Sequence, residues 1–151
     1  MTKSNNVKKF NGQTGLTIIE LLLVMLIMSI IGLLSTSFYS RFLTQNAVEN
    51  TENQLVASFR KAQVYSMIGK QDGIWGVKYT LSPKQITLYL FGNPAFDENY
   101  SVNSNITVTV FDITFAKITG LPSSIANITI SGGNNIKTMT INNQGVVSRT
   151  N

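Results

Sequence analysis

One carboxylate lies where its charge is costly. Glu20 is the only charged residue in the run from Leu16 to Leu34, about 19 predominantly apolar residues. As a helix this run would be roughly 28 Å long, which is enough to cross the hydrocarbon core of a bilayer. A carboxylate at the bilayer centre costs on the order of 3 kcal/mol, and such a residue by default indicates a functional partner. We therefore expect Glu20 to pair with another group, because a segment that only anchored the chain in the membrane would not need a carboxylate.

The residue types that most enzymes use are missing. The chain contains no cysteine and no histidine, which excludes a disulfide framework, a Cys/His zinc site and a histidine general base. The lysines and carboxylates lie in no recognisable catalytic motif. The sequence therefore predicts a protein that is not an enzyme, without a cofactor or a metal.

Two other features suggest binding chemistry. Trp75 is a possible stacking platform for DNA or sugar, but a lone tryptophan at the start of a strand is more often a core or edge anchor. Asp97, Glu98 and Asp112 are possible calcium ligands, but they lack EF-hand spacing. We interpret Trp75 as an anchor and the three carboxylates as solvated loop residues.

Positive charge gathers before the apolar run. The chain carries 12 Lys+Arg against 7 Asp+Glu, and Lys3, Lys8 and Lys9 precede the run without any acid between them. By the positive-inside rule these lysines keep the N-terminus in the cytoplasm and direct the rest of the chain outward. Without them the net charge is roughly +2, too little to argue for a DNA-binding face.

The start of the apolar run carries a family motif. Gly15-Leu16-Thr17-Ile18-Ile19-Glu20, followed by LLLVMLIMSII, resembles the class III leader and N-terminal helix of type IV pilins and pseudopilins. The resemblance combines a short basic leader, a glycine, a glutamate five residues later and an uninterrupted apolar run. A conventional secretory signal, cleaved after the apolar region near Ser35, would leave Glu20 unexplained.

The resemblance implies a processing and assembly pathway. A prepilin peptidase would cut between Gly15 and Leu16, and the new amine of Leu16 would be N-methylated. Glu20 would meet the N-terminal amine of a neighbouring subunit during assembly. The implied partners are the peptidase, other pilin or pseudopilin subunits, the inner-membrane assembly platform and membrane lipid, with DNA as a weaker candidate. The implied location is the bacterial inner membrane, with the head extracytoplasmic, and then the filament.

The sequence departs from many major pilins in two places. Leu16 stands where phenylalanine or methionine is commoner, and the run contains no proline. These departures favour a minor pilin or a pseudopilin.

The helix is predicted to continue to about Lys70. No proline occurs before Pro83, and no glycine occurs between Gly32 and Gly69. Apolar residues then recur at helical spacing, with charged residues such as Glu52 between them. The apolar positions are Phe38, Phe42, Val48, Leu55, Phe59, Ala62 and Tyr65. We expect this stripe to pack under a head domain and the part near Phe38 to be left for contact between subunits.

After Ile74 the apolar residues alternate, as they do in strands. The predicted strands are Ile74–Leu81, Gln85–Phe91, Ile106–Phe115, Ala126–Ile130, Lys137–Ile141 and Val146–Arg149. Turn residues at 82–84 and 142–145 predict two hairpins. The polar segment from Gly92 to Ser104 is interpreted as a variable surface loop. Trp75-Gly76-Val77 and the TINNQGVV hairpin resemble the H-type pseudopilin and T-type minor pilin group.

These observations give an α+β fold class, with a long helix packed on a small antiparallel sheet as in the pilin fold. The expected parts are a leader at 1–15, a transmembrane and filament-core helix at 16–37, an amphipathic half at 38–70 and a β-rich head at 71–151. Two alternatives stay open. A single-pass anchored β-domain would capture a ligand through Gly92–Ser104, and a tip pilin would bind DNA if the dispersed lysines Lys78, Lys84, Lys117 and Lys137 converge.

Overall fold

A computed structural model describes residues 17–150, except for the side chains of residues 34–38. The chain divides into two units, one ending at Phe38 and the other beginning at Tyr39. From residue 18 onward the first unit is helical, and the second contains helix and two four-stranded sheets. The α+β class predicted from the sequence is confirmed.

Helix α1 comprises Ile18–Met67. It begins after Thr17, whose side-chain oxygen accepts a hydrogen bond from the backbone N–H of Glu20 at 3.3 Å, as an N-cap residue does. It ends because Gly69 adopts a left-handed conformation with φ of 64°, a common way to terminate a helix. The helix therefore stops three residues before the predicted Lys70, and a short 3-10 helix, η1 (Lys70–Asp72), follows.

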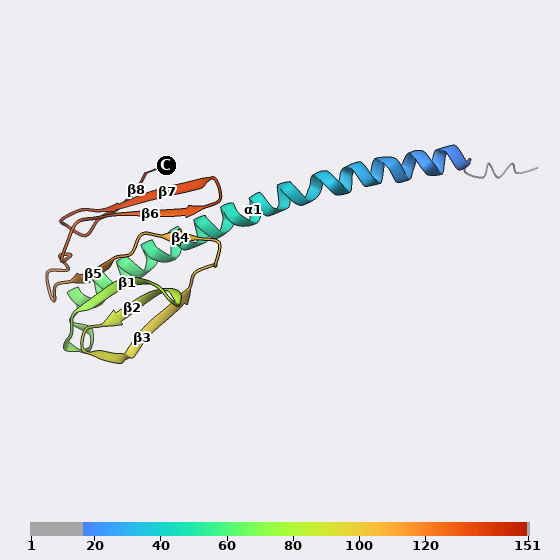
Figure 1. Cartoon of the computed structure of the whole chain (residues 1–151). Helices are drawn as coiled ribbons and strands as arrows, with labels where there is room; N and C mark the ends of the chain where they lie inside the picture. Colours follow the sequence, from blue (N-terminus) through green and yellow to red (C-terminus); the bar gives the residue numbers. More distant parts are fainter. Residues whose placement is uncertain (1–16, 151) are drawn as a thin grey trace, which may run out of the picture. The chain divides into compact units, whose positions relative to one another are not determined.

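The second unit contains two antiparallel sheets where one was predicted (Figure 1). The first has the order β3-β2-β1-β5 and the second the order β4-β6-β7-β8. Their strands are β1 (Trp75–Leu81), β2 (Lys84–Leu90), β3 (Asn93–Ser101), β4 (Thr107–Val108), β5 (Asp112–Phe115), β6 (Ala126–Gly132), β7 (Asn135–Ile141) and β8 (Val147–Thr150).

The predicted strand Ile106–Phe115 is wrong as a single element. Its first part, β4, pairs with β6, whereas its second part, β5, pairs with β1. The change of partner falls between Thr109, whose N–H donates to Thr129, and Phe111, whose carbonyl accepts from Tyr79. The apolar alternation changes phase at this point, because Val110 and Phe111 are adjacent apolar residues and Val110 is exposed. The sequence therefore carried a sign of the break, since a shift of one residue moves the side chains to the other face of a strand.

The predicted loop Gly92–Ser104 is also wrong, because it contains the nine-residue strand β3. Strand β3 lies at the edge of the first sheet and pairs only with β2. Most of its side chains are exposed or half-buried. A strand at a sheet edge can therefore lack regular apolar alternation, and the absence of that pattern does not distinguish it from a loop.

Both predicted hairpins are confirmed. Ser82 and Pro83 connect β1 to β2, and residues 142–146 connect β7 to β8. In the second turn the Asn142 side-chain oxygen accepts hydrogen bonds from the N–H groups of Gln144 and Val146, both at 2.9 Å. Gly145 has φ of 79°, a conformation that favours glycine.

One hydrophobic core joins the second half of α1 to both sheets. Val48, Leu55, Phe59 and Ala62 are each at most 1% exposed, which confirms that the predicted apolar stripe packs under the head. Phe42 is 59% exposed and lies outside this core. Trp75 is 1% exposed and donates its indole N–H to the Lys70 carbonyl at 2.9 Å, so its interpretation as a core anchor is confirmed.

Phe59 is the clearest test of this core. Its ring lies 5.3 Å from that of Phe111 and 6.3 Å from that of Phe115. We expect Phe59→Ala to lower the free energy of unfolding by about 3–5 kcal/mol, through lost burial and the cavity that remains. Chemical denaturation followed by circular dichroism measures this change. Phe42→Ala is the matched control, and an equal loss in both variants would contradict the assigned core.

Candidate assembly site

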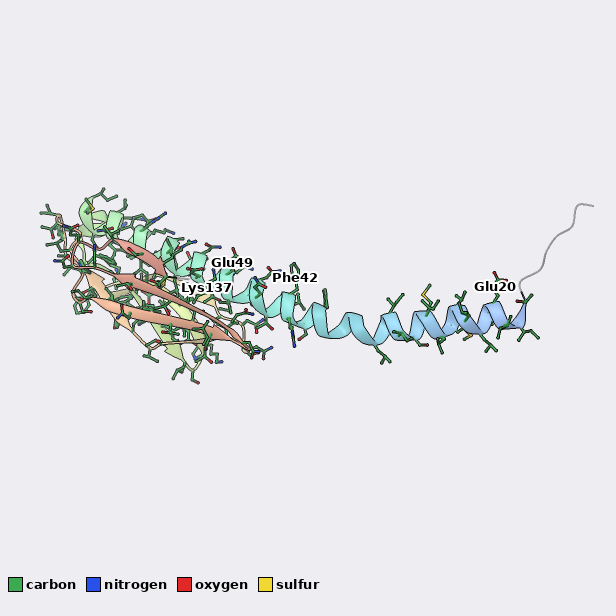
Figure 2. All side chains as sticks on the ribbon, turned by 90° about the horizontal axis from the view of Figure 1, so that it is seen from above. Glu20, Phe42, Glu49 and Lys137 are labelled. Carbon is green, nitrogen blue, oxygen red and sulfur yellow. The ribbon has the colours of Figure 1, made fainter. Side chains whose placement is uncertain are left out.

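The first half of α1 exposes its apolar side chains on every side. From Ile18 to Leu33 every large apolar side chain is exposed, from 45% at Ile27 to 83% at Ile18. Figure 2 shows these side chains projecting around the ribbon near Glu20. A helix that is apolar all round is normally buried, in a protein interior or in a membrane. Within its own unit this segment has no such cover.

Glu20 lies in the first turn of α1. Its backbone N–H is capped by Thr17, and its exposed side chain makes no ion pair among residues 17–150. A carboxylate at this position is stabilised by the positive end of the helix dipole. Glu20 therefore has a local role in starting the helix, in addition to the pairing role that the sequence predicts.

The processing residues cannot be placed in the same way. Gly15 and Leu16 lie outside the described residues, as does the side chain of Leu34. In the part of the chain that the structure describes, no helix is both long enough and apolar enough to cross a membrane.

Glu52 was predicted as one of the charged residues between the apolar positions of the helix, but it is buried among them. Its side chain is only 2% exposed and forms ion pairs with Lys137 on β7, at 3.4 Å, and Arg149 on β8, at 3.6 Å. Arg149 also donates to the Asn53 side chain at 2.9 Å. These contacts attach the last two strands to α1. The spacing of Val48, Glu52, Leu55 and Phe59 places Glu52 on the apolar stripe, and this signal was available in the sequence.

The three acidic residues considered as calcium ligands lie on two different strands. Asp97 and Glu98 lie on β3 and Asp112 on β5, so they are not in a loop as interpreted. Glu98 accepts hydrogen bonds from Lys61 and from the Tyr100 hydroxyl, and Asp112 accepts one from Tyr89. Among residues 17–150, no group of three acidic, histidine or cysteine residues is placed to hold a metal.

The dispersed lysines each have a different contact. Lys78 lies 4.8 Å from the centre of the Tyr89 ring, and Lys84 donates to the carbonyls of Ser104 and Ile106. Lys117 pairs with Asp72, and Lys137 pairs with Glu52. The charges of Lys117 and Lys137 are therefore paired with carboxylates.

Two polar grooves lie on the second unit. The first has a volume of about 520 Å³ and is lined by α1 and the end of β3; its residues are Ala47, Asn50, Thr51, Gln54, Ile86 and 99–103. The second has a volume of about 510 Å³ and is lined by α1 and the turn between β6 and β7.

Comparison with known proteins adds no relative. The chain matches no protein-family model, and no curated protein and no solved structure matches it.

The Lys61–Glu98 pair makes a testable contribution to stability. Lys61 joins α1 to β3, with 2.6 Å between its Nζ and a Glu98 oxygen. The hydrogen bond from Lys61, helped by that from Tyr100, lowers the pKa of Glu98 below its ordinary 4.5. A carboxylate with a lowered folded-state pKa stabilises the fold above its unfolded pKa, and this contribution disappears as the pH falls through the folded value.

We therefore expect Glu98→Gln to lower the melting temperature at pH 7 and to have progressively less effect as the pH falls below 4.5. Thermal melts of both proteins between pH 7 and pH 3 measure the difference. Glu49→Gln, at an exposed carboxylate on α1, is the control. A Glu98→Gln deficit that stays constant across this range would show that the ion pair does not cause it.

Proposed function

We propose that the chain is a structural subunit of a type IV pilin-like filament, processed after Gly15 and assembled through its N-terminal helix. The observation that carries the proposal is the Gly15–Glu20 motif directly before an apolar segment whose described side chains are all exposed. A segment of this kind needs an apolar partner, either lipid or other subunits. The proposed span extends to Leu16 and Leu34, beyond the described side chains.

In this proposal, hydrolysis of the Gly15–Leu16 peptide bond frees a positively charged amine on Leu16. The amine of one subunit then pairs with Glu20 of its neighbour. In a surrounding of low dielectric each charge compensates the desolvation of the other, whereas either charge alone is strongly unfavourable. Subunits that stack with this pair in place bury their apolar helices together, and their heads face outward.

The different burial of the two halves of α1 supports this proposal. The second half is committed to the head, because Leu55 and Phe59 are fully buried against the two sheets. Among the described residues of the first half, the large apolar side chains are exposed. In this proposal the head is stabilised by its own core, and the first half of α1 contacts lipid before assembly and other subunits afterwards. The proposed system is a type IV pilus, a type II secretion pseudopilus or a DNA-uptake filament.

A binding module is the second candidate. Residues 99–103, from the segment first interpreted as a binding loop, line the 520 Å³ groove. Asn50, Gln54 and Asn103 place side-chain amides on its lining, which suit a neutral polar ligand. In this alternative the helix only anchors the head, and Glu20 is dispensable.

Substitutions at Glu20 and Thr17 separate assembly from helix capping. We expect Glu20→Gln to keep the protein in the membrane but to reduce the sheared filament fraction at least about a hundredfold, because the neighbour's amine loses its counter-charge. Thr17→Ala removes the cap and costs the helix about 1 kcal/mol, yet it should leave filaments intact. Immunoblots of membrane and sheared fractions from the native host measure both.

The filament yields of the two variants distinguish a role of Glu20 in assembly from a role within its own helix. Equal filament loss in both would assign the Glu20 side chain to stabilising the first turn of the helix. Normal filaments or normal function with Glu20→Gln would favour the anchored binding module.

A further inference from the structure

The second polar groove has the lining of an anion site. It lies against the part of α1 that Phe42 marks in Figure 2 and against the turn between β6 and β7. Its volume is about 510 Å³, and its lining residues are Ser40, Arg41, Thr44, Gln45, Gly132, Gly133, Asn134 and Asn135. Every residue with a longer side chain in this set is polar or positively charged.

Close packing at one glycine holds the turn beside the helix. A Cβ atom on Gly132 would lie 2.5 Å from Ile106 Cδ1, 2.8 Å from Val48 Cγ2 and 3.1 Å from Thr44 Cγ2. The first two distances are shorter than real Cβ contacts, so a side chain at this position would have to displace Ile106 and Val48. Glycine therefore allows β6 to lie this close to α1. Gly133 then turns the chain with φ of 56°. The groove is therefore a consequence of core packing and is present in the folded head.

Arg41 is the only charged residue that lines the groove, and the lining contains no carboxylate. Its guanidinium forms no ion pair among the described residues. The side-chain amides of Gln45, Asn134 and Asn135 supply further N–H donors at the same groove. A planar guanidinium beside several neutral donors suits an oxygen-rich anion, and above all phosphate.

The place of Arg41 in the sequence identifies the source of that phosphate. Arg41 follows Leu34 by seven residues, so the chain keeps it within about 25 Å of the end of the apolar run in any conformation. If Leu16–Leu34 crosses the membrane, as the proposed function requires, the run ends at the outer leaflet and Arg41 is at most this distance from its headgroups. We propose that the groove binds the phosphate group of an anionic phospholipid headgroup. Arg41 pairs with the phosphate, and the neighbouring amides bind its oxygens.

The test uses the full chain, labelled with nitrogen-15, in micelles of a neutral maltoside detergent. Dihexanoyl-phosphatidylglycerol is titrated in, and the N–H signals of Asn134, Asn135 and Arg41 are followed by NMR. We expect saturable shifts of the Asn134 and Asn135 signals, with an affinity at least about tenfold weaker in Arg41→Gln, because a charge-assisted contact is lost. Gln45→Glu should weaken binding similarly by placing a carboxylate beside Arg41.

Arg60→Gln is the matched control, since Arg60 is an exposed arginine on α1 that lines neither groove. It should leave the titration unchanged. Shifts that do not saturate, or that persist in Arg41→Gln, would overturn the proposal.

A second titration uses inorganic phosphate and distinguishes a lipid headgroup from the free anion as the ligand. Saturable, Arg41-dependent shifts with phosphatidylglycerol at lower concentration than with phosphate support the lipid headgroup. Shifts with phosphate alone overturn the lipid as ligand and leave a site for the free anion. Because binding of free phosphate needs no membrane, this titration also tests the anion site independently of the proposed membrane anchoring. A groove that binds phosphate in a chain that fails to float with vesicles would refute membrane anchoring without refuting the site.

Discussion

Helix α1 has two parts that differ in the burial of their apolar side chains. In the second half, the side chains at Val48, Leu55, Phe59 and Ala62 are enclosed by the two sheets. In the first half, the described apolar side chains from Ile18 to Leu33 are exposed. At about 25 cal/mol per Å² of apolar surface, such a segment is strongly driven to leave water. The functional proposal depends on this constraint, and in that proposal Glu20 supplies the charge that pairs with a neighbouring subunit.

The head is built so that its own stability does not depend on that segment. Phe59 contacts the rings of Phe111 and Phe115 from the first sheet. On the other side of the core, the buried Glu52 attaches β7 and β8 through Lys137 and Arg149. A buried charge of this kind is weak evidence for added stability, but removing one partner leaves an uncompensated charge. Glu52 therefore fixes how the second sheet lies on α1, and the groove at Arg41 forms where that sheet's first turn meets the helix.

The sequence predicts the elements that depend on local chemistry. The long helix follows from the absence of proline and from the spacing of apolar residues, and the hairpin at Asn142–Gly145 follows from its turn residues. The sequence misses features that depend on distant partners. Strand β3 lacks regular apolar alternation because it lies at a sheet edge, and β4 and β5 separate because their neighbours differ. The burial of Glu52 follows from its position on the apolar stripe, although its charge alone would predict an exposed residue.

The candidate site was predictable only in part. The motif at Gly15–Glu20 is visible in sequence, whereas the N-cap at Thr17 and the exposure of the following apolar side chains come from the structure. The Arg41 groove had no sequence signal, because its lining comes from segments about 90 residues apart that meet only after folding.

The most direct test of the central claim is the N-terminus of the mature protein. Intact-mass and N-terminal analysis of the membrane-extracted chain from its own host, for wild type and Gly15→Ala, would measure it. The account predicts a mature wild-type chain that starts at Leu16, with or without one added methyl group, and an unprocessed Gly15→Ala chain. A wild-type chain that keeps its leader, or one that is cut beyond Leu34, would contradict the account.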